Sequence, residues 1–322
     1  MIAVIPVAGW GKRLRPLTYA IPKTLIKVAG KEVIHHIVER IRNLPIDKIV
    51  LVVSEESKEI KELIEKRFGI DTDIVFQKER LGLGHAIYLT KEKVKGEMLI
   101  ILGDTIVDTD YEEFTRGCSK IASKVVEDPR KYGVAEVDGK KIINLIEKPE
   151  KPVTNIAVIG LYYIKNADKL FEKLEEIIKK DIRTKGEYQL TDALNLYVKE
   201  EHTEIYEIKK WLDCGSLQGL VNANKELLYH GVEGEIINSV IIEPCLVRGA
   251  RIENSVIGPY CYVEEGANIS DSVIKGSIIY EHAKIEGVYI EDSIIGCGSE
   301  IRKHPLKMWI AHRTKIINFY QF

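Results

Sequence analysis

Apolar residues in the first hundred positions follow two alternating periods. Nearly unbroken apolar runs predict buried strands at residues 2–7, 48–53, 73–76 and 98–102. Between these runs, apolar positions recur every three or four residues, which predicts helices at residues 34–41, 60–64 and 85–95. Strands that alternate with helices predict an α/β fold with a mainly parallel, doubly wound, Rossmann-like sheet.

The pattern changes after residue 130. Residues 132–137 and 141–147 predict two strands joined at Asp138-Gly139, which is a strong hairpin signal. The following segments predict a strand at 157–164, a helix capped by Asn166, helices at 190–199 and 217–229, and a strand at 204–212. We place a boundary close to Gly231, so that the first domain covers residues 1–230.

A shorter apolar period begins after that boundary. Isoleucine or valine recurs in steps of five or six from residue 241 to residue 301, and the strings NSVI, NSVI, DSVI and DSII begin at residues 238, 254, 271 and 292. This hexapeptide pattern predicts a short parallel left-handed β-helix of about four coils, each burying its aliphatic side chains against the next. Residues 231–322 therefore form a second domain, in which we expect the aromatic segment 305–322 to cap the coils or contact another subunit.

Composition and charge exclude several classes of protein. The formal net charge is −2, which gives no support for general binding to nucleic acid or membranes. No apolar run reaches the length of a membrane span and the N-terminus lacks a cationic leader, so we expect a cytoplasmic protein. The five cysteines form no CxxC pair, so we expect reduced, buried thiols with no disulfide or metal role. The same expectation of no transition-metal site applies to His35, His36, His85, His282 and His304.

The loop after the first strand carries the strongest chemical signal. Residues 5–28 read IPVAGWGKRLRPLTYAIPKTLIKV, with glycines at 9 and 11 and cations at 12, 13, 15 and 23. Glycines let the backbone approach a ligand, and the cations favour an anion, so we expect phosphate here. The loop is not a Rossmann fingerprint, because Leu14 stands at its third glycine position, and no Walker A string is present.

Two aspartates complete a candidate site. Asp104 ends the apolar run MLIILGD, and Asp213 follows a strand in WLDCGS. Ligands of such sheets bind beyond the carboxyl ends of the strands, where the basic loop also lies. Paired carboxylates there predict a Mg²⁺ site, since Mg²⁺ prefers oxygen ligands and often keeps phosphate in its shell. The alternative for either residue alone is a helix N-cap.

The chain resembles the sugar-nucleotide pyrophosphorylases. The loop pattern G-x-G-x-R-L-x-P-L-T followed by P-K is similar to the signature of these nucleotidyltransferases, and QKERLGLGHA, YGV, EKP, TNIAVIGLYY and GEYQLTD resemble later motifs of the family. Their order, ending in a short hexapeptide domain, looks most like the long-form glucose-1-phosphate thymidylyltransferases. The resemblance implies that dTTP and glucose 1-phosphate react with the help of Mg²⁺. The edge of the β-helix and the aromatic C-terminal segment predict that the protein is a homo-oligomer.

The resemblance also implies roles for individual residues. The implied nucleotide contacts are Ala8, Gly9, Gly11, Lys12, Arg13, Lys23, Gln77, Gly82 and Asp104. The implied sugar contacts are Gly133, Glu147, Lys148, Asn155, Val158 and Tyr162. The implied catalytic residues are Arg13, Lys23, Asp104, Lys148 and Asp213, of which Asp104 and Asp213 hold the metal.

Some positions depart from the family pattern. Lys12 stands where threonine is usual, Thr105 stands where asparagine is common, and WLDCGS replaces WxDTGT. UTP with glucose or N-acetylglucosamine 1-phosphate is the nearest alternative substrate pair, because UTP differs from dTTP only by one ring methyl and a ribose hydroxyl, and GTP comes next. Two further alternatives are a bifunctional enzyme whose β-helix transfers an acetyl group and a regulatory subunit without activity.

Overall fold

The computed structural model describes residues 1–9, 11–54 and 59–302 and divides the chain into two compact units, Met1–Leu228 and Tyr229 onward. Segment 305–322, predicted as a cap or oligomer contact, lies outside the described residues. Within the described ranges, no helix combines the length and the apolar character that a membrane crossing requires.

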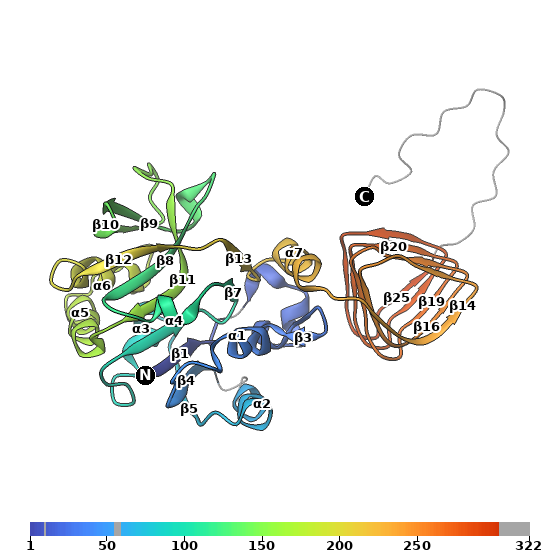
Figure 1. Cartoon of the computed structure of the whole chain (residues 1–322), viewed down its shortest axis with the longest axis horizontal. Coiled ribbons are helices and arrows are strands. Elements are labelled where there is room, and N and C mark those ends of the chain that lie inside the picture. The colour runs from blue at the N-terminus through green and yellow to red at the C-terminus, as the bar shows by residue number, and fades with distance from the viewer. Residues whose placement is uncertain (10, 55–58, 303–322) are drawn as a thin grey trace. The chain divides into compact units, whose positions relative to one another are not determined.

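The first unit contains a large sheet with helices around it (Figure 1). Its helices are α1 (Val33–Ile41), α2 (Glu59–Phe68), α3 (Leu83–Tyr88), α4 (Tyr111–Phe114), α5 (Ala167–Lys179), α6 (Leu190–Tyr197) and α7 (Leu217–Leu227). Its strands are β1 (Ile2–Pro6), β2 (Lys27–Val28), β3 (Lys31–Glu32), β4 (Lys48–Val53), β5 (Thr72–Phe76), β6 (Met98–Ile101), β7 (Thr105–Asp108), β8 (Ser119–Val125), β9 (Gly133–Asp138), β10 (Lys141–Glu147), β11 (Ile156–Ile164), β12 (Thr203–Glu207) and β13 (Lys210–Asp213).

The large sheet has the order β5-β4-β1-β6-β11-β8-β12-β10-β9. In this sheet β10 and β11 are antiparallel to the other described strands, which are parallel to one another. The sheet is therefore mainly parallel, as predicted. Side chains alternate across it. Val4 faces a core cluster shared with α3, α5 and α6, whereas its neighbours Ala3 and Ile5 are buried on the opposite face. Both faces are therefore covered, which confirms the doubly wound α/β architecture.

Two predicted elements in the first unit differ from the structure. The helix predicted at 85–95 is α3, which ends at Tyr88 because the N–H groups of Thr90 and Lys91 bond three residues back instead of four. The strand predicted at 204–212 is two strands that belong to different sheets, since β12 pairs with β8 and β13 pairs with β7. Local apolar pattern cannot reveal this change of partner.

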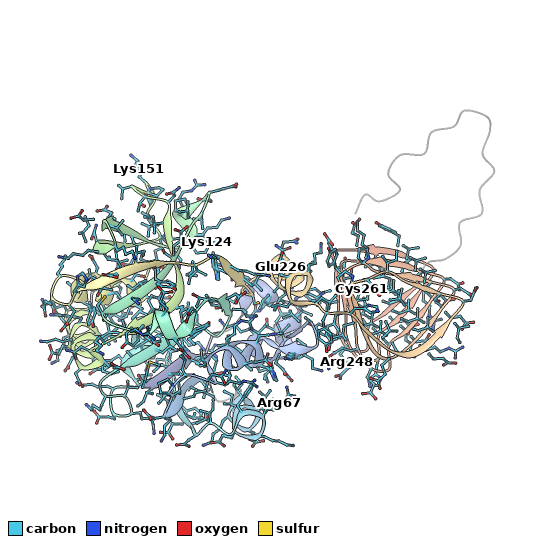
Figure 2. All side chains as sticks on the ribbon, in the orientation of Figure 1. Arg67, Lys124, Lys151, Glu226, Arg248 and Cys261 are labelled. Atoms are coloured by element: carbon cyan, nitrogen blue, oxygen red, sulfur yellow. The ribbon has the colours of Figure 1, made fainter. Side chains whose placement is uncertain are left out.

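The second unit is a coil of short parallel strands that make three flat faces (Figure 1). Its strands are β14 (Gly231–Ile237), β15 (Val240–Ile241), β16 (Cys245–Glu253), β17 (Val256–Ile257), β18 (Cys261–Val263), β19 (Asn268–Ser270), β20 (Val273–Lys275), β21 (Ile278–Ile279), β22 (Lys284–Glu286), β23 (Tyr289–Glu291), β24 (Ile294–Ile295) and β25 (Glu300–Arg302). The aliphatics predicted to repeat in steps of five or six all join its inner cluster. Figure 2 shows side chains filling the coil, and Cys261 is labelled within this unit. The predicted hexapeptide β-helix is confirmed.

The repeated strings explain the corners of the coil. Asn238, Asn254 and Asp271 have positive φ angles of 45°, 49° and 47°, which asparagine and aspartate tolerate. The serines that follow them form a ladder, in which Ser239 Oγ accepts from the N–H of Ser255 and Ser255 Oγ accepts from the N–H of Ser272. The fourth string, at residue 292, lies on a different corner, because Ile294 stacks on Ile278 and not on Ile274. Its irregular spacing therefore marks a change of face and not an insertion.

Candidate active site

The basic loop closes tightly upon itself after β1. It contains three short helical turns, at Lys12–Leu14, Leu17–Tyr19 and Lys23–Leu25. Gly11 has a φ of 57°, and a Cβ there would lie 2.7 Å from Thr18 Cγ2, so the turn requires glycine. Thr18 Oγ1 donates a hydrogen bond of 2.9 Å to the carbonyl of Gly11, which holds the turn closed.

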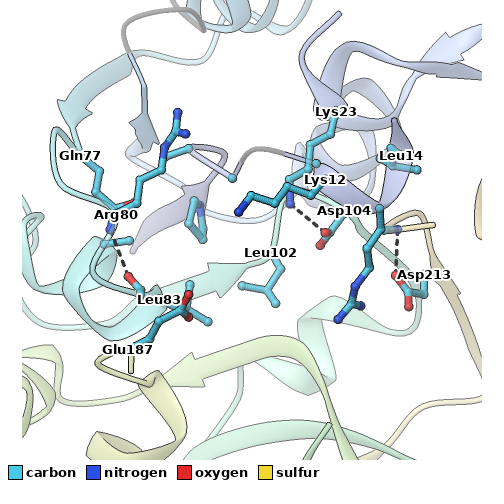
Figure 3. Close-up of a pocket in the computed structure, with 18 residues that line it drawn as sticks. Lys12, Leu14, Lys23, Gln77, Arg80, Leu83, Leu102, Asp104, Glu187 and Asp213 are labelled. Atoms are coloured by element: carbon cyan, nitrogen blue, oxygen red, sulfur yellow. Dashed lines mark hydrogen bonds and ion pairs between the residues drawn. The ribbon is translucent and has the colours of Figure 1, made fainter. Parts of the chain in front are cut away.

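A cavity of about 520 Å³ opens beside this loop (Figure 3). The residues that line it come from the end of β1 and the loop after it, from the segment that follows β5 and includes α3, from the loops after β6 and β13, and from the segment between α5 and α6. They are Pro6, Ala8, Gly9, Gly11, Lys12, Arg13, Leu14, Lys23, Gln77, Arg80, Gly82, Leu83, Ala86, Leu102, Asp104, Glu187, Asp213 and Gly215. Every residue predicted to contact a nucleotide lines this cavity, and so does Asp213.

The two aspartates converge on one point. Asp104 lies between β6 and β7, and Asp213 ends β13, which pairs with β7 so that Asp213 stands opposite Thr105. A Cβ built on Gly215 would lie 2.9 Å from Asp213 Oδ1 and 3.3 Å from Asp104 Oδ2. Glycine thus leaves open a space that both carboxylates border. The helix-cap alternative for Asp213 is wrong, because Ser216 caps α7.

Lys23 supplies the charge that balances Asp104. Its Nζ lies 2.8 Å from Asp104 Oδ2, in an ion pair drawn as a dashed line in Figure 3. Burial opposes the charge of Asp104, but the ammonium of Lys23 outweighs it and holds the pKa of that carboxyl below its usual value. Burial, followed by the charge of Asp104, raises the pKa of Asp213, although the N–H of Gly215 donates to its Oδ1 at 2.9 Å.

These observations fit a hard divalent cation. Two carboxylates border the same small space, and a positive charge placed there would offset both the burial of Asp213 and its repulsion by Asp104, which raise its pKa. The oxygen-only donor set is typical of Mg²⁺, which keeps waters and substrate phosphates as its other ligands. Asp104 and Asp213 are therefore the residues of this cavity that suit Mg²⁺.

The opposite end of the cavity presents an oriented amide. Gln77 Nε2 donates to the carbonyl of Gly82 at 3.1 Å and lies 3.3 Å from His85 Nδ1. A carbonyl only accepts, so the NH₂ group of Gln77 must face Gly82, and Oε1 is left to meet a ligand. Gly82 has a φ of 111°, and a Cβ there would come within 2.6 Å of the Tyr188 carbonyl.

The cavity also contains residues that received no role from the sequence. Arg80 lies between Gln77 and Gly82 in the chain, and Glu187 belongs to the string GEYQLTD. The strings QKERLGLGHA and GEYQLTD, which contain Arg80 and Glu187, resemble motifs of a known family. Only the folded structure shows that these two side chains border the same cavity.

The residues predicted to hold the sugar form a second group. Glu147 ends β10 opposite Gly133, accepts a hydrogen bond of 2.7 Å from Thr191 Oγ1, and pairs with Lys148 at 3.0 Å. Tyr162 is buried close enough to Glu147 that burial and the charge of Glu147 raise the pKa of its phenol. Val158 is also buried on β11, and Asn155 precedes that strand. None of these predicted sugar contacts lines the cavity described above.

Tyr132 connects this second group to the aspartates. Its carbonyl accepts from the N–H of Lys148 at 3.0 Å, and its ring packs edge-on against Trp211 with centroids 5.4 Å apart. Burial, followed by the charge of Asp213, raises the pKa of the Tyr132 phenol. Lys148 itself has a φ of 42°, an uncommon conformation for lysine that is often found at functional sites.

Comparison with known proteins identifies the family. A family model described as "Nucleotidyl transferase" matches residues 2–230. The protein "Bifunctional protein GlmU" of Methanocaldococcus jannaschii is 34% identical over 92% of this chain and 78% of its own length. "Glucose-1-phosphate thymidylyltransferase" of Streptomyces griseus is 28% identical over 98% of this chain and 97% of its own length. The chain belongs to the sugar-nucleotide nucleotidyltransferase family.

Further matches agree with this membership of the nucleotidyltransferase family. A second model, described as "GlmU-like, C-terminal hexapeptide", matches residues 225–304. A solved structure described as UDP-glucose pyrophosphorylase complexed with UDP-glucose superposes with a TM-score of 0.60 and 28% identity, over 70% of this chain and 97% of the other. The predicted resemblance is confirmed, and the chain is a sugar-1-phosphate nucleotidyltransferase.

Proposed function

We propose that the chain condenses dTTP with glucose 1-phosphate to give dTDP-glucose and pyrophosphate. The observation that carries this proposal is the convergence of Asp104 and Asp213 beside Lys23 and the basic loop. A triphosphate needs cations and a metal site, and both surround one cavity here.

The reaction is an in-line displacement. A phosphate oxygen of the sugar 1-phosphate attacks the α-phosphorus of the nucleotide, and the bond from that phosphorus to the bridging oxygen of pyrophosphate breaks. Arg13 and Lys23 bind the triphosphate and the leaving pyrophosphate, while Lys148 orients the sugar phosphate. The chain needs no general base, because a sugar phosphate is already ionised at neutral pH.

Asp104 and Asp213 would hold Mg²⁺ in this reaction. When bound, Mg²⁺ supplies positive charge that stabilises the phosphate oxygens. The ion pair with Lys23 lowers the pKa of Asp104, so its carboxylate remains ionised, which is the form that binds a metal cation.

The orientation of the Gln77 amide favours a nucleotide base that has an imide N–H. Its Oε1 is left to accept because Nε2 faces Gly82 and His85, and the N3–H of thymine or uracil is a matching donor. Thymine and uracil share this edge and differ by one methyl group, which discriminates by about 1 to 3 kcal/mol. UTP is therefore the second candidate nucleotide, with glucose or N-acetylglucosamine 1-phosphate as the acceptor.

A matrix of five nucleoside triphosphates against several sugar 1-phosphates, read as pyrophosphate release, tests the substrate assignment. The highest kcat/KM is expected for dTTP with glucose 1-phosphate. A preference for ATP or CTP, whose bases lack a ring N–H donor at this edge, would contradict the role of Gln77. Adding acetyl-CoA to the same reactions tests for the acetyl transfer that the GlmU-like second unit raises as an alternative.

Replacement of the metal-binding carboxylate tests the mechanism. We expect Asp104→Asn to lower turnover by about a hundredfold or more, because the amide loses the charge that holds Mg²⁺. Asp108→Asn is the matched control, since Asp108 is an exposed carboxylate at the far end of β7. Near-normal pyrophosphate release by Asp104→Asn, with Asp108→Asn unchanged, would contradict the proposed site.

A further inference from the structure

A second cluster of metal-ligating side chains lies in the first unit at the beginnings of β8 and β12. Among the described residues, Cys118, His202 and Glu204 bring a thiol, an imidazole nitrogen and a carboxylate oxygen within 4.8 Å of one another. Asp104 follows the end of β6, which runs parallel to both strands. The cluster therefore lies at the opposite end of the parallel strands from the proposed catalytic carboxylates.

Strand register brings these residues together. Ser119 pairs with Thr203 across β8 and β12, so the preceding residues, Cys118 and His202, are neighbours. Side chains alternate along a strand, so Glu204 projects on the same side as His202, two positions away. The local sequence gives no ligand motif, because the thiol comes from one strand and the other two groups come from another.

The distances suit a tetrahedral zinc ion. His202 Nε2 and Glu204 Oε1 are 3.2 Å apart. Two ligands at about 2.0 to 2.1 Å from a tetrahedral zinc are separated by about 3.3 Å, and a thiolate lies slightly farther from both. Small side-chain rotations within the 4.8 Å cluster therefore give three ligands to one ion, with water in the fourth position.

Neighbouring cations leave room for this ion. Lys120 is in register with Glu204, but its Nζ donates to the carbonyl of Glu113 and lies over the ring of Tyr206. Lys141, on β10, is the other cation in register with Glu204, and its side chain is exposed. His202 is also exposed, so an ion can reach the cluster from solvent.

We propose that Cys118, His202 and Glu204 form a zinc-binding site separate from the Mg²⁺ site. Binding displaces the thiol proton of Cys118 to solvent, and the thiolate, the neutral imidazole and the carboxylate each donate one lone pair to Zn²⁺. The mixed sulfur and nitrogen donors select zinc over Mg²⁺, which prefers oxygen. The ion would link the amino-terminal ends of β8 and β12 and stabilise their pairing.

Cobalt(II) is a direct probe of the full-length protein. After treatment with a chelator and its removal, titration with Co²⁺ is expected to give a near-ultraviolet thiolate-to-cobalt charge-transfer band that saturates at one equivalent and disappears when Zn²⁺ is added. The pair Asp104 and Asp213 offers only oxygen, so it cannot produce this band. Failure of the wild-type protein to give the band would overturn the proposal.

Variants assign the band to its ligands. Cys118→Ser is expected to abolish it, and His202→Ala is expected to weaken Co²⁺ binding about tenfold or more. Cys297→Ser is the matched control, because Cys297 is an exposed thiol in the other unit. An unchanged band in Cys118→Ser, or its loss in Cys297→Ser, would contradict the assignment.

Zn²⁺ should also raise the unfolding temperature of the wild-type protein but not that of His202→Ala, and an equal rise in both would contradict the site.

Discussion

At the residue scale, Lys23 and Gly215 shape the proposed catalytic centre in opposite ways. Lys23 adds charge beside Asp104, whereas Gly215 provides space between the carboxylates by lacking a side chain. Neither contribution can be derived from its own sequence position, because each depends on a residue from another loop.

We expect His85 to act as a positioning residue for Gln77, because its Nδ1 lies 3.3 Å from the Gln77 amide nitrogen. Burial lowers the pKa of its imidazole, although the charge of Glu79 opposes the shift, so the ring is neutral at pH 7 and Nδ1 can accept from Gln77. We expect His85→Leu to reduce the preference for dTTP over CTP about fivefold, because the amide loses one hydrogen bond worth about 1 kcal/mol. The measurement is the ratio of kcat/KM values for the two nucleotides.

A conservative replacement separates positioning from packing. His85→Asn offers an amide oxygen that can accept from Gln77, so it should recover part of the preference, whereas His85→Leu should not. If both variants retain the wild-type ratio, His85 has no part in orienting Gln77.

The anion-binding loop of the candidate site could be predicted from the sequence, whereas isolated charged residues of the same cavity could not. Glycines and cations within one loop indicate an anion site from the sequence alone, so Gly11 and Lys23 could be assigned to such a site before the fold was known, although the pairing of Lys23 with Asp104 could not. Arg80 and Glu187 could not, because an isolated charged residue does not reveal which cavity it borders. The roles of the sugar contacts remain predictions, as Glu147 and its neighbours form a group outside the described cavity.

At the element scale, apolar periodicity predicted most of the first unit. Strands such as β4 are buried on both faces and read as continuous apolar runs. β8 was missed because serines and lysines interrupt its sequence SKIASKV, although most of its residues are buried. Its polar residues find partners only in the folded sheet, for example Ser119 Oγ with the phenol of Tyr197 at 2.9 Å.

Helix α1 contains a buried histidine that links stability to pH. Burial lowers the pKa of His36 to about 4, against the opposing hydrogen bond to the Val28 carbonyl, whereas the ordinary value is 6.5. Below pH 6.5 the unfolded chain therefore binds a proton that the folded chain does not, so stability falls as the pH drops toward 4. By about pH 4.5 we expect a loss of about 2 to 3 kcal/mol from this residue.

Calorimetry at about pH 7.5 and about pH 4.5 measures this dependence. His36→Gln, which does not titrate, should lose less stability than the wild-type protein between the two conditions. Equal losses would show that His36 does not contribute to the acid sensitivity of the first unit.

At the scale of the whole molecule, two kinds of core support the two units. The first unit is stabilised by a sheet between helices, and the second by repeated aliphatic layers inside a coil. The hexapeptide period revealed the second core directly from sequence, because each layer repeats the same environment. A cytoplasmic location and a homo-oligomeric state remain predictions.

Replacement of a single inward aliphatic residue tests how much the stacked core stabilises the second unit. Ile274 is fully buried, while its neighbour Val273 is 41% exposed on the outside. Ile274→Ala should lower the unfolding free energy of the second unit by about 2 to 5 kcal/mol, because it leaves a cavity between layers. Val273→Ala is the control and should cost much less. Calorimetric transitions of the two units provide the measurement, and equal effects of the two substitutions would contradict this account of the core.

The serine ladder makes the coil extensible in discrete lengths. Successive turns present to the next an inward aliphatic and an open row of backbone groups, and Ser239, Ser255 and Ser272 each present a hydroxyl to the backbone N–H of the next turn. Adding or deleting one complete turn preserves which residues face inward, whereas a one-residue insertion reverses them from that point to the next corner. Gene duplication can therefore lengthen this region stepwise without redesign of its interior, and relatives that differ in turn number can share every other part of the architecture.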